Sequence, residues 1–291
     1  LPVILRPRFT FAYDFKLIIW RYLTLPYYKD QRMQELLAKT TNIAKQAASL
    51  AKKYYLDRSF TISHKGHRNL VTEADIAVEE FLKKELSTLV PDARFLAEET
   101  ANLTSDFTGN VWIVDPIDGT TNFTQGLPHC AVSVALAIDG VVTVAVVVNI
   151  FTGETFSALK NHGAFRNGIK LDKVKENPHG LFLLGFLNSE GEKFEENFIL
   201  MRKLKTHVHE FRRLGAASLD ICYVACGIAV AYLESVRPWD IAAGALVARE
   251  CGCLVGTYRE DPLNNALPSD LISFSFLVAH PQKYELILKA L

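Results

Sequence analysis

The sequence predicts a layered α/β protein, of α+β type, with two sub-domains. Patterns typical of β-hairpins crowd the first half of the chain, whereas helical and strand patterns alternate in the second half. Hydrophobic residues make up 49% of the 291 positions, which is ample for a sizeable core. The polar run 172–180 is the best boundary, so the sub-domains are expected at 33–172 and 173–291.

Residues 1–32 are expected to be an extension outside this fold. The sequence begins with Leu1 rather than Met, and its first stretch mixes proline, aromatic and basic residues without a clear period. The longest apolar run there, 17–20, is too short to span a bilayer, and charged residues interrupt any signal-peptide core. We therefore expect no targeting segment, and an upstream translation start would account for the extension.

Regular patterning starts with an amphipathic helix over 33–55, where apolar residues fall near one face. The polar stretch 59–69 is expected to be a loop. A second helix is predicted over 74–89, because Thr72 and Asp75 have the spacing of a capping box.

Strand patterns then dominate the rest of the first half. Apolar runs predict strands at 111–114, 131–138, 141–150, 155–158 and 163–171. The Asp139-Gly140 pair suits a two-residue turn, so the second and third of these strands should form a hairpin.

Helix and strand patterns alternate beyond the polar boundary. Helices are predicted at 193–204, 216–226, 240–251 and 282–290. Strands are predicted at 181–187, 229–233 and 274–279.

The balance of charged residues and the number of cysteines indicate which kinds of partner and which compartment to expect. Lys+Arg and Asp+Glu both number 32, so net charge gives no reason to expect nucleic acid or a membrane surface as the main partner. A small ligand is the better expectation. The five cysteines match no zinc pattern and their odd count argues against a disulfide framework, so we expect reduced core residues in a cytoplasmic protein.

The segment 112–123, Trp-Ile-Val-Asp-Pro-Ile-Asp-Gly-Thr-Thr-Asn-Phe, carries most of the functional information. It places two carboxylates, Asp115 and Asp118, at the end of an apolar run and follows them with Gly-Thr-Thr. A strand would deliver both carboxylates, and the next backbone N–H groups would be left for an anion. This order predicts a metal-assisted phosphate site.

Other carboxylates are expected to converge on this segment, although each has a simpler interpretation. Glu98 could belong to a solvated acidic turn, and Asp240 could only cap the helix that follows it. Asp75 could complete a capping box and have no other role. The Asp115 to Asp118 stretch could itself be a proline turn.

Six motifs occurring together make coincidence improbable. They lie at 70–75, 97–100, 112–126, 163–168, 213–218 and 239–244. In this order they resemble the inositol monophosphatase family, and the match runs over about 33–291. The resemblance implies an alternating αβαβα sandwich, as in the sugar phosphatases, and a magnesium-dependent, lithium-sensitive phosphatase that is usually a homodimer.

The resemblance also implies a role for each metal ligand. Glu98, Asp115 and the carbonyl of Ile117 would hold one Mg²⁺, while Asp115, Asp118 and Asp240 would hold a second. A third, weaker ion would share Glu98 with water. Oxygen ligands of this kind suit Mg²⁺ better than any softer metal.

The remaining site residues are expected to bind water and substrate. Asp75 and Thr120 match the pair that activates the attacking water, which Glu98 helps to position. Backbone N–H groups of Gly119, Thr120 and Thr121 would bind the phosphate.

The loop of Gly215, Ala216 and Ala217 would contact the hydroxyl groups of the substrate, and Glu234 is the candidate hydroxyl-binding glutamate. Glu234 lies six residues before Asp240, one fewer than is usual, so it could instead be an exposed charge at a strand end.

These expectations describe a Mg²⁺-dependent phosphomonoesterase that hydrolyses inositol monophosphate, or a similar small polyol phosphate, by direct attack of metal-activated water. Histidinol phosphate, fructose bisphosphate and nucleotide 3′-phosphates are alternative substrates with the same chemistry. A regulatory binding role in RNA processing or transcription is the alternative of a different class. The neutral charge balance and the complete ligand set argue against nucleic acid or transcription machinery as the sole partner.

Overall fold

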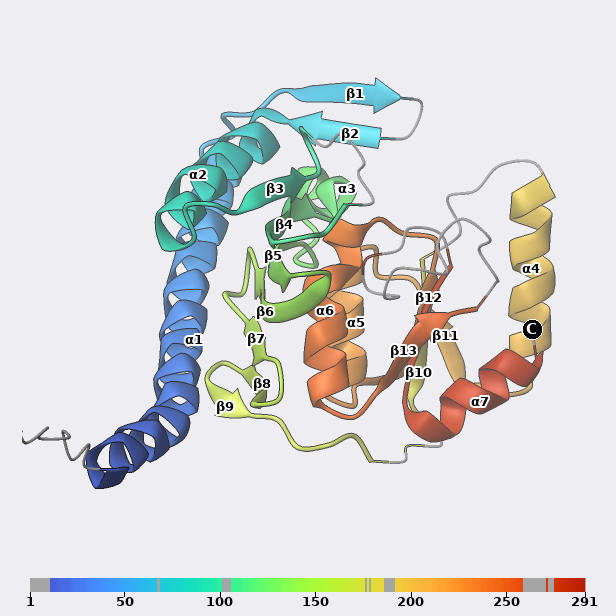
Figure 1. Cartoon of the computed structure of the whole chain (residues 1–291). Coiled ribbons are helices and arrows are strands. Elements are labelled where there is room, and N and C mark those ends of the chain that lie inside the picture. Colours follow the sequence, from blue (N-terminus) through green and yellow to red (C-terminus); the bar gives the residue numbers. More distant parts are fainter. Residues whose placement is uncertain are drawn as a thin grey trace, which may run out of the picture.

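The computed structural model describes residues 11–66, 69–100, 106–175, 177, 179–185, 192–258, 271 and 275–290. Two large β-sheets, a separate two-stranded hairpin and three layers of helices make up this part of the chain (Figure 1). None of its helices combines the length and the apolar character that crossing a bilayer requires. All five cysteines are free thiols, as the sequence predicts.

The first sheet contains seven strands in the order β3-β4-β5-β6-β7-β8-β9. Their bounds are β3 (Arg94–Ala97), β4 (Asn110–Asp118), β5 (Ala131–Ile138), β6 (Val141–Asn149), β7 (Thr155–Leu159), β8 (Gly163–Arg166) and β9 (Ile169–Lys170). Only β3 and β4 pair in parallel; the other pairs in this sheet are antiparallel. The predicted turn at Asp139-Gly140 joins β5 to β6, and both residues have positive φ, as a tight hairpin requires.

The second sheet contains five strands in the order β11-β10-β12-β14-β13. Their bounds are β10 (Leu181–Leu184), β11 (Glu210–Arg212), β12 (Ala229–Glu234), β13 (Leu254–Thr257) and β14 (Phe276–Ala279). β10 pairs in parallel with β11 and β12, whereas β14 is antiparallel to both of its neighbours.

Helices form the outer layers and the middle layer. α1 (Phe11–Leu56) and α2 (Glu73–Leu89) cover one face of the first sheet, while α5 (Ala217–Ala225) and α6 (Pro238–Glu250) lie between the two sheets (Figure 1). α4 (Glu192–Leu204) and α7 (Pro281–Ala290) cover the far side of the second sheet. The predicted αβαβα sandwich is therefore confirmed.

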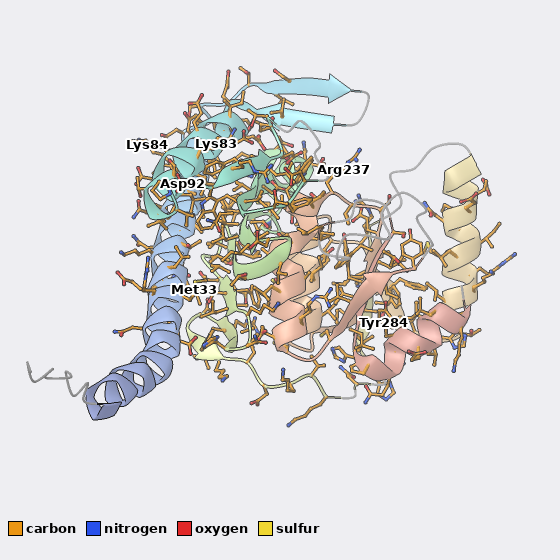
Figure 2. The ribbon with its side chains drawn as sticks, viewed as in Figure 1. Met33, Lys83, Lys84, Asp92, Arg237 and Tyr284 are labelled. Atoms are coloured by element: carbon orange, nitrogen blue, oxygen red, sulfur yellow. The ribbon has the colours of Figure 1, made fainter. Side chains whose placement is uncertain are left out.

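Burial on both faces explains the nearly continuous apolar runs of the central strands. In β4, Val111 and Ile113 pack toward the middle layer, whereas Trp112 and Val114 pack toward α1 and α2. Side chains fill the spaces between all these layers (Figure 2). The cluster of the middle layer joins residues of both predicted sub-domains, for example Ile113 and Leu246.

Close packing within the middle layer has a clear cause in the sequence. α6 contains a run of small residues, and a Cβ added at Gly244 would lie 2.9 Å from the Cβ of Ile221 on α5. Two helices can therefore approach closely enough to fit between two sheets. The Ala-Ala-Gly string of the 239–244 motif is thus a packing feature as well as a family marker.

Several element predictions are wrong in detail. The expected loop at 59–69 is instead the first part of an antiparallel hairpin, β1 (Ile62–Gly66) and β2 (Asn69–Thr72), while residues 67 and 68 lie outside the described residues. The expected strand at 163–171 is two strands joined by a turn at Asn167-Gly168. β3, β11 and β13 are not predicted because strands of three or four residues give too short a pattern.

α1 begins at Phe11 rather than near Met33, so residues 11–32 continue the first helix instead of forming an irregular segment. The assignment of residues 1–32 as an extension, and the division at 172–180, stay predictions. The capping box of α2 is confirmed: Thr72 accepts from the backbone N–H of Asp75, and the Asp75 carboxylate accepts from the N–H of Thr72.

The packing of α2 on the first sheet gives a test of the outer core. Leu82 is fully buried on this helix, whereas Ile76 on the same helix is 48% exposed. We expect Leu82→Ala to lower the free energy of unfolding by about 2–5 kcal/mol, since it leaves a cavity. Ile76→Ala should change it by less than about 0.5 kcal/mol. Urea denaturation of both variants measures the difference, and equal effects would contradict this packing.

Candidate metal centre

The end of β4 directs two carboxylates to the same side of the sheet. In a regular strand, residues three apart point to opposite faces. Here Asp115 pairs with Ser133 and Asp118 with Ala131, so β4 takes three steps where β5 takes two. This β-bulge brings both carboxylates to the face that packs on the middle layer.

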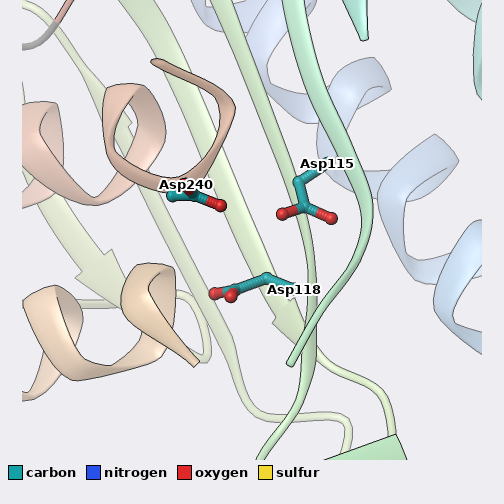
Figure 3. A group of neighbouring side chains, drawn as sticks. All are labelled: Asp115, Asp118 and Asp240. Atoms are coloured by element: carbon teal, nitrogen blue, oxygen red, sulfur yellow. The ribbon is translucent and has the colours of Figure 1, made fainter. Parts of the chain in front are cut away.

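α6 brings the third carboxylate to the same place. Asp240 lies in the first turn of α6, which packs on β4 and β5. One oxygen from each of Asp115, Asp118 and Asp240 lies within 4.8 Å of the other two (Figure 3). Asp240 also accepts a hydrogen bond of 2.7 Å from the N–H of Arg237. Asp240 therefore caps the start of α6 and also lies beside the two carboxylates of β4.

Burial and mutual repulsion disfavour three negative charges in this position. Burial raises the pKa of Asp115 well above its usual value, and the charges of neighbouring carboxylates raise it further, first Glu98 and then Asp118. Burial, assisted by the charge of Asp118, raises the pKa of Asp240 to about 8. Among the described ion pairs, none involves these three aspartates.

A hard divalent cation fits this donor set. The carboxylates offer only oxygen, and a cation between them would replace repulsion with attraction. The backbone carbonyl of Ile117 accepts from the Thr120 hydroxyl at 3.0 Å and keeps a second lone pair. The residues present therefore suit Mg²⁺.

Asp118 is held by the first turn of α5. Its Oδ1 accepts from the N–H of Ala217 at 3.1 Å, and its Oδ2 accepts from the N–H and the hydroxyl of Ser218 at 2.7 and 2.5 Å. Burial raises the pKa of Asp118 to about 6, although the bonds from Ser218 oppose this rise. Sequence reasoning missed Ser218, because no local pattern links it to a carboxylate one hundred residues earlier.

Asp75 and Thr120 meet as the sequence predicts. The Thr120 hydroxyl lies 3.3 Å from Asp75 Oδ1, and Thr72 holds the other carboxylate oxygen through its N–H at 2.8 Å and its hydroxyl at 2.6 Å. Burial raises the pKa of Asp75. The capping box of α2 thus orients a carboxylate toward the start of α3 (Thr120–Gln125).

Glu98 is a neighbour of the three aspartates rather than a member of their group. The parallel register of β3 with β4 pairs Ala97 with Val114, and the N–H of Glu98 donates to the Val114 carbonyl at 3.2 Å. This register places Glu98 beside Asp115. The half-buried position of Glu98 does not match the alternative of a fully solvated turn.

Two loops expected to bind substrate lie against each other. Gly119 has φ +86°, and a Cβ there would lie 3.0 Å from the carbonyl oxygen of Gly215 and 3.1 Å from the Cβ of Ala216. Only glycine allows both the conformation and this approach. Asn122 on α3 donates to the carbonyl of Leu214 at 2.8 Å, which fastens the two loops together. Thr121 is exposed and Ala217 is buried.

Glu234 ends β12 and is half-buried, so it is not a fully exposed charge. The Tyr232 hydroxyl donates to its carboxylate, and the Cα of Gly185 lies against it. Burial raises the pKa of Glu234 to about 7. Its charge also contributes to the raised pKa of Asp240.

A buried His–Asp pair supports the loop that is expected to bind substrate, and it was not found from the sequence. His129 Nε2 lies 2.8 Å from Asp220 Oδ1. Burial raises the pKa of Asp220, and hydrogen bonds from His129 and from the backbone of Gly215 oppose this rise. The carbonyl of His129 accepts from Asn122 at 2.7 Å. The pair therefore connects the start of β5 to the loop at 214–217.

Comparison with known sequences identifies relatives over most of the chain. The sequence model described as inositol monophosphatase family matches residues 32–291. Nus factor SuhB of Pasteurella multocida is 34% identical over 227 residues, which cover 77% of this chain and 85% of the relative. Inositol monophosphatase 1 of Solanum lycopersicum is 33% identical over 235 residues, with the same two coverages.

Solved structures show the same fold. Extragenic suppressor protein suhB from Bartonella henselae superposes with a TM-score of 0.74 at 29% identity, covering 86% of this chain and 96% of that one. Inositol monophosphatase from Anabaena gives 0.73 at 26% identity, covering 89% and 96%. A staphylococcal IMPase-I complexed with products gives 0.73 at 25% identity, covering 85% and 91%.

The raised carboxyl pKa values predict how pH affects stability without metal. A carboxyl whose pKa is higher in the folded state adds stability below its unfolded value, 3.8 for Asp, and loses it as pH rises through the folded value. We expect the melting temperature of metal-free protein to fall between about pH 5 and about pH 8.5. Mg²⁺ should oppose this fall, since it binds the charged carboxylates.

The Asp240→Asn variant shows how much of the fall in melting temperature comes from Asp240 rather than from other titrating groups. It should flatten the upper part of the fall, around the Asp240 pKa of about 8, in thermal melts without metal. The exposed Asp92 provides a matched control, and Asp92→Asn should retain the full slope. Equal slopes in wild type and Asp240→Asn would contradict the assigned environment.

Proposed function

The chain belongs to the inositol monophosphatase family, and from this premise we propose that it is a Mg²⁺-dependent phosphomonoesterase acting on inositol monophosphate or a similar small polyol phosphate. The observation that carries the proposal is the convergence of Asp115, Asp118 and Asp240 within 4.8 Å. Carboxylates brought this close, none of which joins an ion pair among the described residues, favour a reaction that needs divalent cations.

The proposed ligand sets are those that the family resemblance implies, and the convergence of the three aspartates supports the second of them. Asp115, with Glu98 and the Ile117 carbonyl, would hold one ion, and Asp115, Asp118 and Asp240 would hold the second. A third would share Glu98 with water. Bound Mg²⁺ neutralises phosphate charge and makes a water molecule more acidic. The raised pKa values of Asp115 and Asp240 support cation binding, because a cation stabilises the charged carboxylates against the burial and the mutual repulsion that raise them.

Thr120 and Asp75 are proposed to receive the proton of the attacking water. The Thr120 hydroxyl has one hydrogen, which can go to the Ile117 carbonyl or to Asp75. When Asp75 accepts it, the lone pairs of the Thr120 oxygen can accept a hydrogen bond from water. Transfer from water to Thr120 and from Thr120 to Asp75 would balance the charge. Burial raises the pKa of Asp75, which makes its carboxylate a stronger base than an exposed one.

Substrate binding is proposed to use both loops. The backbone N–H groups of Gly119, Thr120 and Thr121 would hold the phosphate. Gly215, Ala216 and Ala217, with Glu234, would hold the hydroxyl groups of the polyol. The N–H of Ala217 already donates to Asp118, so other backbone groups of this loop would meet the substrate.

A substrate panel tests the proposal directly. Phosphate release from inositol monophosphates, histidinol phosphate, fructose bisphosphate and nucleotide 3′-phosphates would be measured with and without Mg²⁺, and with Li⁺. Asp115→Asn protein, purified in the same way, gives the background rate of phosphate release. Inositol monophosphate should give the highest kcat/KM. Preference for histidinol phosphate by orders of magnitude would replace the inositol assignment, and absence of Mg²⁺-dependent release would overturn the function.

A binding role in RNA processing or transcription is a second candidate, and the name Nus factor SuhB among the relatives favours it. Both roles could coexist on one fold. If Asp115→Asn abolished turnover but complemented a deletion strain fully, the binding role would account for the cellular function. Loss of complementation with normal protein levels would favour the enzymatic role.

Three further properties are part of the proposal. Family resemblance implies inhibition by Li⁺ and a homodimer, and five free cysteines agree with a cytoplasmic location. Enzyme assays with Li⁺ and sedimentation of the purified protein would test the first two. Fractionation of cells would test the third.

Thr120→Val should slow the chemical step without weakening Mg²⁺ binding. The change keeps the side-chain volume but removes the hydroxyl between water and Asp75, so kcat should fall by about 100-fold or more. The Mg²⁺ concentration for half-maximal activity should change little. Thr120→Ser retains the hydroxyl and should stay within about 10-fold of wild type. Activity of Thr120→Val equal to wild type would exclude this proton route.

Glu234→Gln tests the hydroxyl-binding role. Loss of a charged acceptor should raise KM for inositol monophosphate by about 10-fold, while kcat for a phosphate ester without polyol hydroxyls stays unchanged. Ser235→Ala alters the exposed neighbouring residue and should leave both constants as they are. An unchanged substrate profile in Glu234→Gln would remove this residue from the site.

A further inference from the structure

Glu79 on α2 is a buried carboxylate that the proposed reaction does not use. Only 2% of the residue is exposed, and its oxygens accept three hydrogen bonds. Oε2 accepts from the N–H of Glu99 at 2.8 Å, and Oε1 accepts from the Thr100 hydroxyl at 2.7 Å and from Lys83 Nζ at 2.8 Å. Lys83 lies on the same helix (Figure 2).

Two of these donors directly follow Glu98. The turn at 98–100 has backbone bonds of its own, from Glu98 N–H to the Val114 carbonyl and from Thr100 N–H to the Ala97 carbonyl. These bonds connect the turn to the first sheet. The Glu79 carboxylate adds a connection from the same turn to α2.

α2 also holds the base of the proposed reaction. Asp75 and Glu79 are four residues apart on one helix, so they lie on the same face one turn apart. Thr72 fixes the first carboxylate and the turn at 98–100 fixes the second. A single rigid helix therefore links the proton acceptor to the segment that carries a proposed metal ligand.

We infer that Glu79 is a positioning residue, which fixes Glu98 beside Asp115 through the Glu99 N–H and the Thr100 hydroxyl. This inference rests on the proposed metal site. Burying a carboxylate is costly unless several donors satisfy it, and here those donors come from the turn itself. Groups that orient a ligand from behind typically change metal affinity by 10-fold to 100-fold when they are removed.

A purely structural role, anchoring α2 to the sheet, makes a different prediction. It would lower thermal stability and leave metal affinity of the folded protein unchanged. Direct metal binding at a temperature well below unfolding therefore distinguishes the two roles. Mn²⁺ is a suitable probe, because its binding can be followed by electron paramagnetic resonance without substrate or turnover.

Glu79→Gln is the main variant, since an amide cannot accept from all three donors. We expect its Mn²⁺ affinity to fall by about 10-fold at folded-state temperatures. Glu80→Gln alters the next residue on α2, which is exposed, and should bind Mn²⁺ as wild type does. Normal Mn²⁺ affinity in Glu79→Gln, with or without a lower melting temperature, would overturn the inference.

A double-mutant cycle shows whether the effect passes through Glu98. In a Glu98→Gln background, adding Glu79→Gln should weaken Mn²⁺ binding by less than about 2-fold, because the positioned ligand is already gone. A further 10-fold loss would show that Glu79 acts elsewhere and would overturn the inference.

Thr100 provides a second route if Glu79→Gln does not fold. Thr100→Val removes one donor and should weaken Mn²⁺ binding, whereas Thr100→Ser keeps the hydroxyl and should restore it. Equal affinities in the two variants would overturn the inference. Absence of phosphatase activity in wild type would refute the proposed function alone, because every comparison here is made by metal binding.

Discussion

The site depends on holding two buried carboxylates and a half-buried one close together against their mutual repulsion. Asp115, Asp118 and Asp240 are brought together by elements whose positions the core already determines: a bulged strand end in the first sheet and the first turn of a helix in the middle layer. The apolar packing of these elements opposes the repulsion in the absence of cations. A cation that bound there would therefore also stabilise the folded state.

The layered architecture explains why several elements end at this one place. β4 delivers two aspartates, α5 supplies the N–H groups that hold Asp118, and α6 delivers Asp240. α2 approaches from the opposite side of the first sheet and contributes Asp75. Because the middle helices pack tightly through small residues such as Gly244, the distances between the sheets and the site residues are well determined.

Local patterns predicted the parts of the structure that depend on local sequence. Apolar runs gave the central strands, the capping spacing of Thr72 and Asp75 gave the start of α2, and a dense motif gave the carboxylates of β4. The hairpin β1–β2 was missed because its polar residues and Gly66 resemble a loop. Ser218 and Glu79 were missed for a different reason, since each contacts residues distant in sequence that only the folded sheets and helices bring close.

The two halves of the site are constrained to different degrees. Asp75, Asp115 and Asp118 each accept hydrogen bonds from the backbone, and their elements are buried in the core. The side proposed to bind the polyol would depend on Glu234 at the end of β12, and the resemblance to the family implies a connection from there to α6 that is one residue longer than the one present. A shorter connection shifts a strand end more easily than it shifts a bulged central strand. The phosphoryl chemistry should therefore be closer to that of the family than the choice of leaving group.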